Sequence, residues 1–387
     1  MLKLQANVEF SANDAKMMAR ALKLAEKGKQ STTPNPHVGC VIINSQQQII
    51  GEGFHKTVGE GHAEALALQQ TNGMAEGATA YVTLEPCAHY GQTPPCAQAL
   101  IDAKIKRVVV ACADPNPQVS GKGIAMLLSA GIEVSLGLMQ ASAIALNKAF
   151  FFRMQYKRPF IIVKLAASLD GKTALANGQS KWITGPLARA DVQRHRAQAC
   201  AILTGADTVI ADNPKLNVRT EELPLTLSEQ FLWRGRQPLR VVIDSQNRLS
   251  ASKYHIFQDG HETLVYNANN NADLPNLDSV SYSQKQIATV HQHKREYIDL
   301  NAVLTDLHTM GINQLWVEAG EKLSGALFDS GVVDQLILYQ APKILGSSAK
   351  GLTRATAKSN LCQALTGEVS FVGLLGSDTK TIIEFSH

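Results

Sequence analysis

Residues 81–96 of this chain read YVTLEPCAHYGQTPPC, and residues 61–64 upstream read GHAE. The apolar run before Cys87 predicts a strand, whereas Cys96 and His62 stand at the predicted starts of helices. One imidazole and two thiolates can hold a zinc ion and leave a fourth position for water, which is typical of a catalytic site. The three side chains therefore predict a zinc centre built where strands end and helices begin in an α/β domain.

Glu64 lies two residues after His62, where its carboxylate can reach a zinc-bound water without binding the metal. A histidine, a glutamate and two cysteines in this order are the pattern of zinc-dependent base deaminases, in which an activated water displaces ammonia from a C–NH₂ carbon. Glu64 would pass the proton of the water to the ring nitrogen and to the leaving amine. Each residue alone is more often a structural cysteine or a surface histidine, but the joint pattern favours the deaminase.

The spacing of the two cysteines departs from the common deaminase signature. Eight residues, 88–95, separate them here, whereas the common signature has two. The intervening segment contains His89, which is an alternative metal ligand. We expect His89 to face substrate or solvent, because Cys96 holds the position at the helix start.

Length and composition limit the classes of protein that fit. The chain of 387 residues is too long for one ordinary domain, and 45% hydrophobic with 18% charged residues is typical of a globular protein. The net charge of +4, from scattered Lys and Arg, disfavours a surface that coats nucleic acid but suffices for a phosphorylated small molecule. Sparse cysteines, no membrane-length apolar run and no evident signal peptide predict a cytoplasmic protein without a membrane span.

The pattern of apolar residues predicts two successive α/β domains, residues 1–156 and 157–387. For the first domain we expect helices at 14–27, 62–70, 96–103, 124–130 and 141–151, and strands at 38–43, 49–54, 79–84, 108–111 and 132–135. For the second we expect strands at 160–167, 201–204, 240–244, 263–266, 314–318 and 334–342, and helices at 187–199, 302–310 and 324–330. The Asn-rich segment 267–278 predicts an exposed loop.

Motifs along both halves resemble the bifunctional deaminase/reductase family of riboflavin biosynthesis. The first half carries TPNPHVGCVI, GHAEALAL, the quoted stretch from 81 to 96 and ADPNPQVSGKG; the second carries KLAASLDGKTA, SKWITG, ILTGADTVIADNP, VVIDSQNR, WVEAG and APKILG. The eight-residue cysteine spacing is usual in that family. The resemblance covers roughly residues 13–387.

The resemblance implies two reactions and two folds. The first reaction is hydrolytic deamination of 2,5-diamino-6-(5-phosphoribosylamino)pyrimidin-4(3H)-one at a zinc site, in a cytidine-deaminase-like three-layer domain. The second is NADPH-dependent reduction of the ribosyl group of the product to ribityl, in a dihydrofolate-reductase-like domain. The partner is thus a phosphorylated pyrimidine rather than a nucleic acid or a membrane, and we expect the chain to work as a homo-oligomer.

The residues alone reveal little of the reductase site, because no GxGxxG fingerprint follows a strand. The segment 320–326, between a predicted strand and a helix, is either a phosphate-binding turn or an ordinary turn from strand to helix. The resemblance identifies it with the NADP-binding segment of the family. By the same resemblance, the cofactor would contact Ala166, Trp182, Thr208, Asp212, Ser245, Gly320, Glu321, Lys322, Leu323, Ser324, Gly325 and Ala326. The substrate would contact Ser180, Arg196, Leu216, Arg219 and Glu318.

Charged residues in the second half are candidates for binding and proton transfer. The guanidinium groups of Arg196 and Arg219 have the planar geometry that suits a substrate phosphate. Lys164 stands in an otherwise apolar strand, so it needs a partner or a function. Lys164, Asp212 and Glu318 remain alternative proton donors for the reduction, and we expect Glu318 to shape the substrate site.

Two other functions fit parts of the sequence. One is a zinc-dependent nucleic-acid base deaminase with a C-terminal binding domain, which the mild charge and the lack of a basic, aromatic-studded strand set disfavour. The other is a metal-sensing or scaffold protein, which would leave Glu64 without a role.

Overall fold

The computed structural model describes residues 9–88, 94–117, 119–223, 233, 235–269, 282–292 and 295–386. His89 and most of the expected loop 267–278 lie outside these residues. The chain folds into two compact units, with residues up to Tyr156 in the first and residues from Lys157 in the second, except that Trp233 groups with the first. Among the described residues, no helix is long and apolar enough to cross a membrane.

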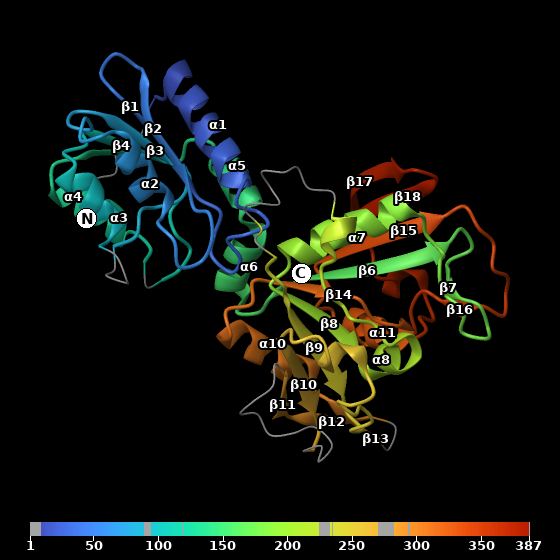
Figure 1. The fold of residues 1–387 in the computed structure, drawn as a ribbon. Coiled ribbons are helices and arrows are strands. Elements are labelled where there is room, and N and C mark those ends of the chain that lie inside the picture. Colours follow the sequence, from blue (N-terminus) through green and yellow to red (C-terminus); the bar gives the residue numbers. More distant parts are fainter. Residues whose placement is uncertain are drawn as a thin grey trace. The chain divides into compact units, whose positions relative to one another are not determined.

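The first unit, drawn in blue to green in Figure 1, is built on a five-stranded sheet with the strand order β2-β1-β3-β4-β5. β1 pairs antiparallel with β2 and β3, whereas β3, β4 and β5 run parallel. The strands are β1 (Gly39–Ile43), β2 (Ile49–Phe54), β3 (Thr79–Val82), β4 (Arg107–Val110) and β5 (Glu133–Leu136). The helices are α1 (Ala12–Glu26), α2 (Ala63–Gln70), α3 (Cys96–Asp102), α4 (Lys122–Ser129), α5 (Gln140–Leu146) and α6 (Lys148–Tyr156).

Alternating side chains of the central strands fill two separate cores. Cys40 and Ile42 of β1 belong to one buried cluster, while Val41 and Ile43 belong to another. Because successive side chains of a strand point to opposite faces, both faces of the sheet are covered. Residues of α2, α3 and α4 pack in the first cluster, and residues of α1 and α5 pack in the second. This arrangement is the expected three-layer α/β domain.

Close contact between α2 and β2 brings the start of α2 to the sheet. A Cβ atom on Gly53 would lie only 2.2 Å from the carbonyl oxygen of Ala63, the first residue of α2. Any larger residue at Gly53 would therefore push the helix outward. His62, which caps α2, is positioned by this contact.

The second unit is built on a nine-stranded sheet with the order β11-β10-β9-β8-β14-β6-β15-β18-β17. The strands from β11 to β15 in this order run parallel, and β18 and β17 complete one edge antiparallel. They are β6 (Phe160–Ser168), β8 (Ala201–Gly205), β9 (Leu239–Asp244), β10 (Thr263–Asn267), β11 (Tyr282–Gln286), β14 (Gln314–Val317), β15 (Gln335–Ala341), β17 (Glu368–Leu375) and β18 (Asp378–Glu384).

Helices and two small sheets surround this large sheet. The helices are α7 (Pro186–Gln198), α8 (Ala206–Asp212), α10 (Leu300–Thr309) and α11 (Glu321–Asp329). The pairs β7 (Lys172–Ala174) with β16 (Lys350–Gly351), and β12 (Thr289–Gln292) with β13 (Arg295–Ile298), form the small sheets. A buried aliphatic cluster that includes Ile161, Leu203, Val241 and Leu315 forms the core of the unit.

The structure differs from the sequence-based expectation at several elements. The single helix expected at 141–151 is two helices, because Asn147 leaves helical geometry (φ −112°, ψ 26°) and its side chain bonds the backbone of His37 instead. The helix α8 and the strands β7, β11, β12, β13, β16, β17 and β18 were not predicted. β17 is largely exposed, so it lacks the buried apolar alternation that would reveal it.

Candidate active sites

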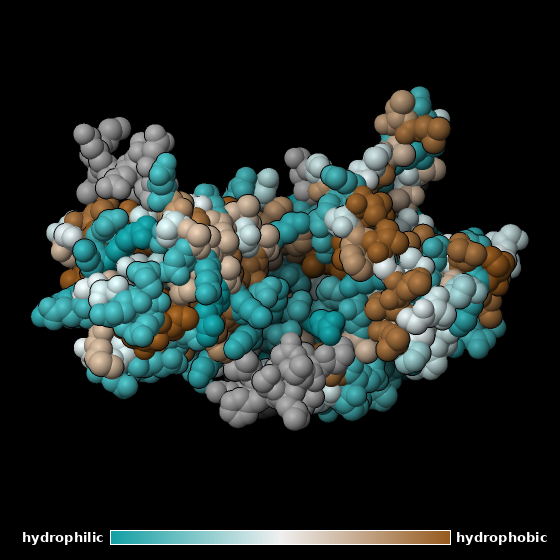
Figure 2. Space-filling model, turned by 90° about the horizontal axis from the view of Figure 1, so that it is seen from above, coloured by the Kyte–Doolittle hydropathy of each residue, from teal (hydrophilic) through white to brown (hydrophobic). Residues whose placement is uncertain are grey.

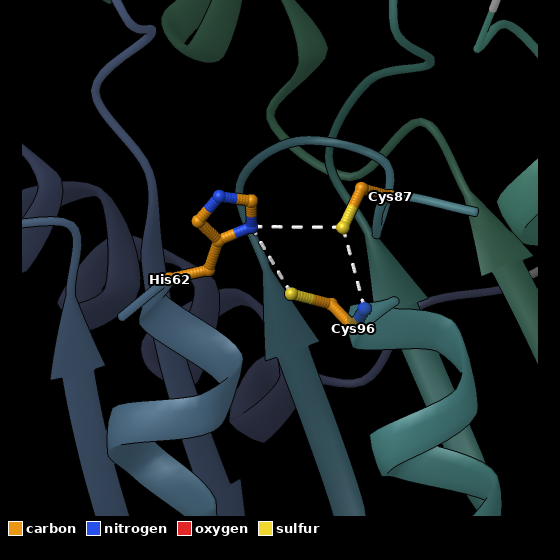
Figure 3. A group of neighbouring side chains, drawn as sticks. All are labelled: His62, Cys87 and Cys96. Carbon is orange, nitrogen blue, oxygen red and sulfur yellow. Dashed lines mark hydrogen bonds between the residues drawn. The ribbon is translucent and has the colours of Figure 1, made fainter. Parts of the chain in front are cut away.

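The three predicted zinc ligands converge in the first unit (Figure 3). Nδ1 of His62 lies 3.2 Å from Sγ of Cys96 and 3.6 Å from Sγ of Cys87, and the three ligand atoms lie within 4.8 Å of one another. Ordinary Zn–N and Zn–S bonds at tetrahedral angles place nitrogen and sulfur about 3.5 Å apart. The spacing therefore fits a shared zinc ion.

Each ligand stands at the end of a secondary-structure element. His62 caps α2, Cys96 opens α3, and Cys87 follows β3. Hydrogen bonds from Cys96, and also from His62, lower the pKa of Cys87 to about 4 despite partial burial. The hydrogen bond with Cys87 also raises the pKa of His62. The pocket thus favours a thiolate at Cys87, which is the form that binds metal.

Glu64 is buried in the first turn of α2, beside the three ligands. Burial raises its pKa to about 7, although the nearby His62 partly opposes this shift. A hydrogen bond to the Cys96 side chain places the carboxylate against the ligand set, outside the His–Cys–Cys group itself. A carboxyl group with such a pKa can both accept and return a proton near neutral pH.

Glu85, which the sequence reasoning missed, fixes the loop opposite the metal ligands. Its buried carboxylate accepts hydrogen bonds from four backbone N–H groups, at 3.0–3.2 Å, in the segment 114–124. A Cβ on Gly123 would lie 1.9 Å from the carbonyl oxygen of Pro86, so this segment packs directly on the residue before Cys87. The sequence signal was the Glu-Pro-Cys order, in which a charged residue ends an apolar strand.

His55 is a second residue that the sequence reasoning missed. Its ring meets the ring of His62 edge-on, with centroids 5.4 Å apart. The amide nitrogen of Asn35 donates to Nε2 at 3.0 Å, so Nδ1 carries the proton and donates to the carbonyl oxygen of Gly61 at 3.3 Å. Burial lowers the pKa of His55, consistent with a neutral ring that packs beside the ligand histidine.

The second unit contains a cavity of about 1920 Å³, which is large enough for a dinucleotide and a nucleotide-sized substrate. All five predicted substrate residues line it: Ser180, Arg196, Leu216, Arg219 and Glu318. So do ten of the twelve predicted cofactor residues: Ala166, Trp182, Thr208, Asp212, Ser245, Gly320, Glu321, Lys322, Leu323 and Ala326.

Ser324 and Gly325 do not belong to this lining, contrary to the sequence-based expectation. Both are buried in α11. The hydroxyl of Ser324 donates to the carbonyl oxygen of Ala319, and a Cβ on Gly325 would lie 2.5 Å from the backbone of Arg354. Only one side of a helix can face a cavity, and these two residues pack on the other side.

Arg196 and Glu318 form a buried pair at the cavity wall. Nε and Nη2 of Arg196 donate to the two carboxylate oxygens at 2.6 and 2.9 Å, and Nη1 donates to the carbonyl oxygen of Asn217 at 2.8 Å. Burial raises the pKa of Glu318, but the charge and hydrogen bonds of Arg196 outweigh burial and bring the pKa to about 2. The guanidinium is therefore bound within the protein rather than held open for a phosphate, which corrects the role expected for Arg196.

Side chains from α7 and the β9 region hold the cavity loop 213–219, which contains no helix or strand. Arg240 donates to the carbonyl oxygen of Lys215 at 2.8 Å, and Gln237 bonds both backbone groups of Val218. Gln193 accepts from the backbone N–H of Arg219 at 3.0 Å. The guanidinium of Arg219 reaches Glu222 at 2.7 Å and is partly exposed at the cavity.

The fold and the two sites define a two-domain enzyme, with a zinc deaminase centre in one unit and a nucleotide-sized cavity in the other. Residues 11–112 match the family model described as the cytidine and deoxycytidylate deaminase zinc-binding region. Residues 159–370 match the model of the RibD C-terminal domain. These matches agree with the geometry, which places the zinc centre in the first unit and the nucleotide-sized cavity in the second.

The chain belongs to the RibD family of riboflavin biosynthesis proteins. It is 46% identical to RibD of Haemophilus influenzae over 96% of this chain and 98% of the relative. It is 47% identical to RibD of Escherichia coli over 91% of this chain and 94% of the relative. The family is a bifunctional deaminase and reductase that uses zinc and NADPH, so the predicted function and cofactors are confirmed.

Solved structures agree over nearly the whole chain. Acinetobacter baumannii RibD is 41% identical with a TM-score of 0.86, covering 97% of this chain and 99% of that one. The Thermotoga maritima protein titled a diaminohydroxyphosphoribosylaminopyrimidine deaminase/5-amino-6-(5-phosphoribosylamino)uracil reductase is 32% identical with a TM-score of 0.81, at the same coverage. The expected fold class is thereby confirmed for both units.

Proposed function

We propose that this protein catalyses two successive steps of riboflavin synthesis. It deaminates 2,5-diamino-6-(5-phosphoribosylamino)pyrimidin-4(3H)-one in the first unit and reduces the ribosyl group of 5-amino-6-(5-phosphoribosylamino)uracil with NADPH in the second. The observation that carries the proposal is the convergence of His62, Cys87 and Cys96 beside the buried Glu64, in the same chain as the large cavity.

In the deaminase, His62, Cys87 and Cys96 would hold zinc, which when bound activates a water for attack on the C–NH₂ carbon. Glu64 would carry one proton of that water to the ring nitrogen, where it stays in the product, and then carry the second proton, from the oxygen now bonded to the carbon, to the amine, which leaves as ammonia. Glu85 holds the segment 114–124 through its backbone N–H groups, and Gly123 of this segment packs on Pro86, the residue before Cys87.

In the reductase, bound NADPH would supply a hydride to C1′ of the ring-opened sugar imine, and we propose that Lys164 donates the proton to the imine nitrogen. Glu318 is an unsuitable donor, because its pKa of about 2 leaves it ionised at neutral pH. Asp212 is exposed at the end of α8. Lys164 lines the cavity, and burial lowers its pKa, which eases release of its proton. The positive charge of Arg219 would attract the substrate phosphate.

We further propose that the protein acts as a homo-oligomer in the cytoplasm. The space-filling view shows apolar residues gathered in patches between hydrophilic ones (Figure 2). β17, at the edge of the nine-stranded sheet, exposes Val369, Phe371, Val372 and Leu374. An edge strand with apolar side chains favours pairing with a second copy. Thiolate ligands in turn need a reducing compartment.

An assay on the diaminopyrimidine phosphate that follows ammonia and the nicotinamide absorbance separately tests the two activities. We expect ammonia release without NADPH, and NADPH oxidation only after ammonia release or on supplied aminouracil intermediate. Deamination of labelled RNA with salt-sensitive binding, and no turnover of the small pyrimidine, would instead support the nucleic-acid base deaminase.

A further inference from the structure

A buried polar network contacts Glu318 on the side away from the cavity in the reductase unit. Its members, Trp316, His195, Asp191, Lys380 and Tyr339, do not belong to the cavity lining. It begins at Trp316, two residues before Glu318 on the same strand end. Side chains two residues apart on a strand share a face, so the indole lies alongside the carboxylate. The indole N–H donates to Oε1 of Glu318 at 2.9 Å. Trp316 itself is completely buried, so it can act on the cavity only through Glu318.

The indole is held in place by a histidine from α7. The ring of His195 stacks on Trp316 with centroids 4.8 Å apart and an interplanar angle of 5°. His195 precedes Arg196, which donates to both oxygens of the same carboxylate. One helix therefore supplies both the guanidinium that binds Glu318 and the ring that fixes the orientation of the indole N–H.

His195 is in turn fixed by Lys380 of β18 and by Asp191, which lies one turn earlier on α7. Nζ of Lys380, on β18, lies 3.0 Å from Nε2 of His195 and 2.5 Å from Oδ2 of Asp191. Because an ammonium group can only donate, Nε2 must accept, and the ring is neutral with its proton on Nδ1. Asp191 also accepts a hydrogen bond from the hydroxyl of the buried Tyr339, at 2.7 Å.

We propose that Trp316, supported by His195, is a positioning residue of the reductase that fixes the orientation of the Glu318 carboxylate at the cavity. This rests on the proposed function, with Glu318 shaping the substrate site. Oε1 accepts from Nε of Arg196 and from the indole N–H, whereas Oε2 accepts from Nη2 of Arg196 alone among the residues that the structure describes. The network thereby supplies two donors to Oε1 and leaves Oε2 free to accept a further hydrogen bond from the substrate.

The first test is the full-length Trp316→Phe variant, which keeps an aromatic ring but removes the N–H donor. We expect the reductase kcat on 5-amino-6-(5-phosphoribosylamino)uracil to fall about tenfold, the loss typical of one hydrogen bond to a charged group. The KM for NADPH and the rate of ammonia release stay unchanged. Trp233→Phe is the matched control, because the buried Trp233 indole N–H has no partner among the described residues.

The second test is Trp316→Phe in the Glu318→Gln background. If the indole acts through the carboxylate, the double variant loses no more activity than Glu318→Gln alone. The positioning role would be overturned if the kcat loss of the double variant equalled the product of the two single losses, or if Trp316→Phe kept the wild-type kcat. Either result would leave the proposed function intact. A fully active Glu318→Gln variant would instead contradict the proposed role of Glu318, and the inference would fall with it.

A spectroscopic measurement covers the case in which Trp316→Phe does not fold. The ¹⁵N-labelled wild-type enzyme gives an indole N–H resonance for Trp316, which the hydrogen bond to a carboxylate shifts downfield. We expect Glu318→Gln to move this resonance upfield and to leave that of Trp233 in place. An unmoved Trp316 resonance would show that the bond is absent and would refute the proposal.

Discussion

The two sites differ in how their residues are distributed along the chain. The deaminase centre takes its three ligands and its proton carrier from between His62 and Cys96. The reductase cavity draws on residues from Lys164 to Thr356, brought together by a sheet whose strand order departs widely from the sequence order. A metal site needs a few fixed ligand types, so its chemistry is visible in a short motif. A nucleotide cavity is made by topology, and its residues carry no such local signature.

The largest effect should follow removal of a metal ligand. In Cys87→Ser, the alcohol replaces the thiolate, so we expect loss of both zinc and ammonia release, with NADPH oxidation on supplied aminouracil intermediate retained. Metal analysis and the two separate assays measure this. Cys112→Ser is the matched control, because the Cys112 thiol is buried in the same unit and donates to the carbonyl oxygen of Thr83. A Cys87→Ser enzyme with full zinc would contradict the ligand assignment.

A smaller effect is expected from Glu85→Gln. An amide N–H₂ would replace one oxygen that accepts backbone N–H groups, and each lost hydrogen bond to a charge costs about 1.5–3 kcal/mol. We expect the deaminase kcat to fall about 10- to 100-fold, with the reductase unchanged. Glu76→Gln, at an exposed ion pair with Lys104, should be silent. Unaltered ammonia release by Glu85→Gln would show that the segment 114–124 needs no such anchor.

The smallest change concerns substrate affinity in the reductase. Arg219→Ala should raise the KM for the aminouracil phosphate about tenfold, because one charged contact to phosphate is lost. The deaminase should not respond, and neither should the KM for NADPH. Lys253→Ala removes an exposed cation of the same unit outside the cavity lining and serves as the control. Equal KM values for both variants would exclude Arg219 from phosphate binding.

The sequence predicted the parts of the molecule that depend on local pattern. The sheet of the first unit was found because its strands are short apolar runs, and the zinc ligands were found because their residue types occur in a recognised order at element ends. Glu85 was missed because it binds backbone groups far away in sequence, and His55 was missed because its contact with the ring of His62 follows no recognised motif. The resemblance supplied the cavity residues. It did not indicate that the Arg196 guanidinium donates to the Glu318 carboxylate and to the carbonyl oxygen of Asn217. Only the packing of α7 on β14 reveals these bonds.

The edge strands also show that local sequence pattern does not reveal elements that depend on tertiary contacts. β17 and β18 pair antiparallel beside β15, where β17 exposes apolar side chains instead of burying one face. Nothing in the local pattern marks such a strand, because its register is set by the neighbouring strand. Lys380 of β18 joins the network behind Glu318 for the same reason, through tertiary position alone.

The most direct measurement is made on the full-length Glu64→Gln enzyme, with zinc content, ammonia release and NADPH oxidation recorded on the same preparation. Loss of the proton carrier should leave the three ligands and the second unit untouched. We predict full zinc occupancy, ammonia release at background level and wild-type NADPH oxidation on supplied 5-amino-6-(5-phosphoribosylamino)uracil. Loss of NADPH oxidation together with ammonia release would contradict the account of two separate active sites in one chain.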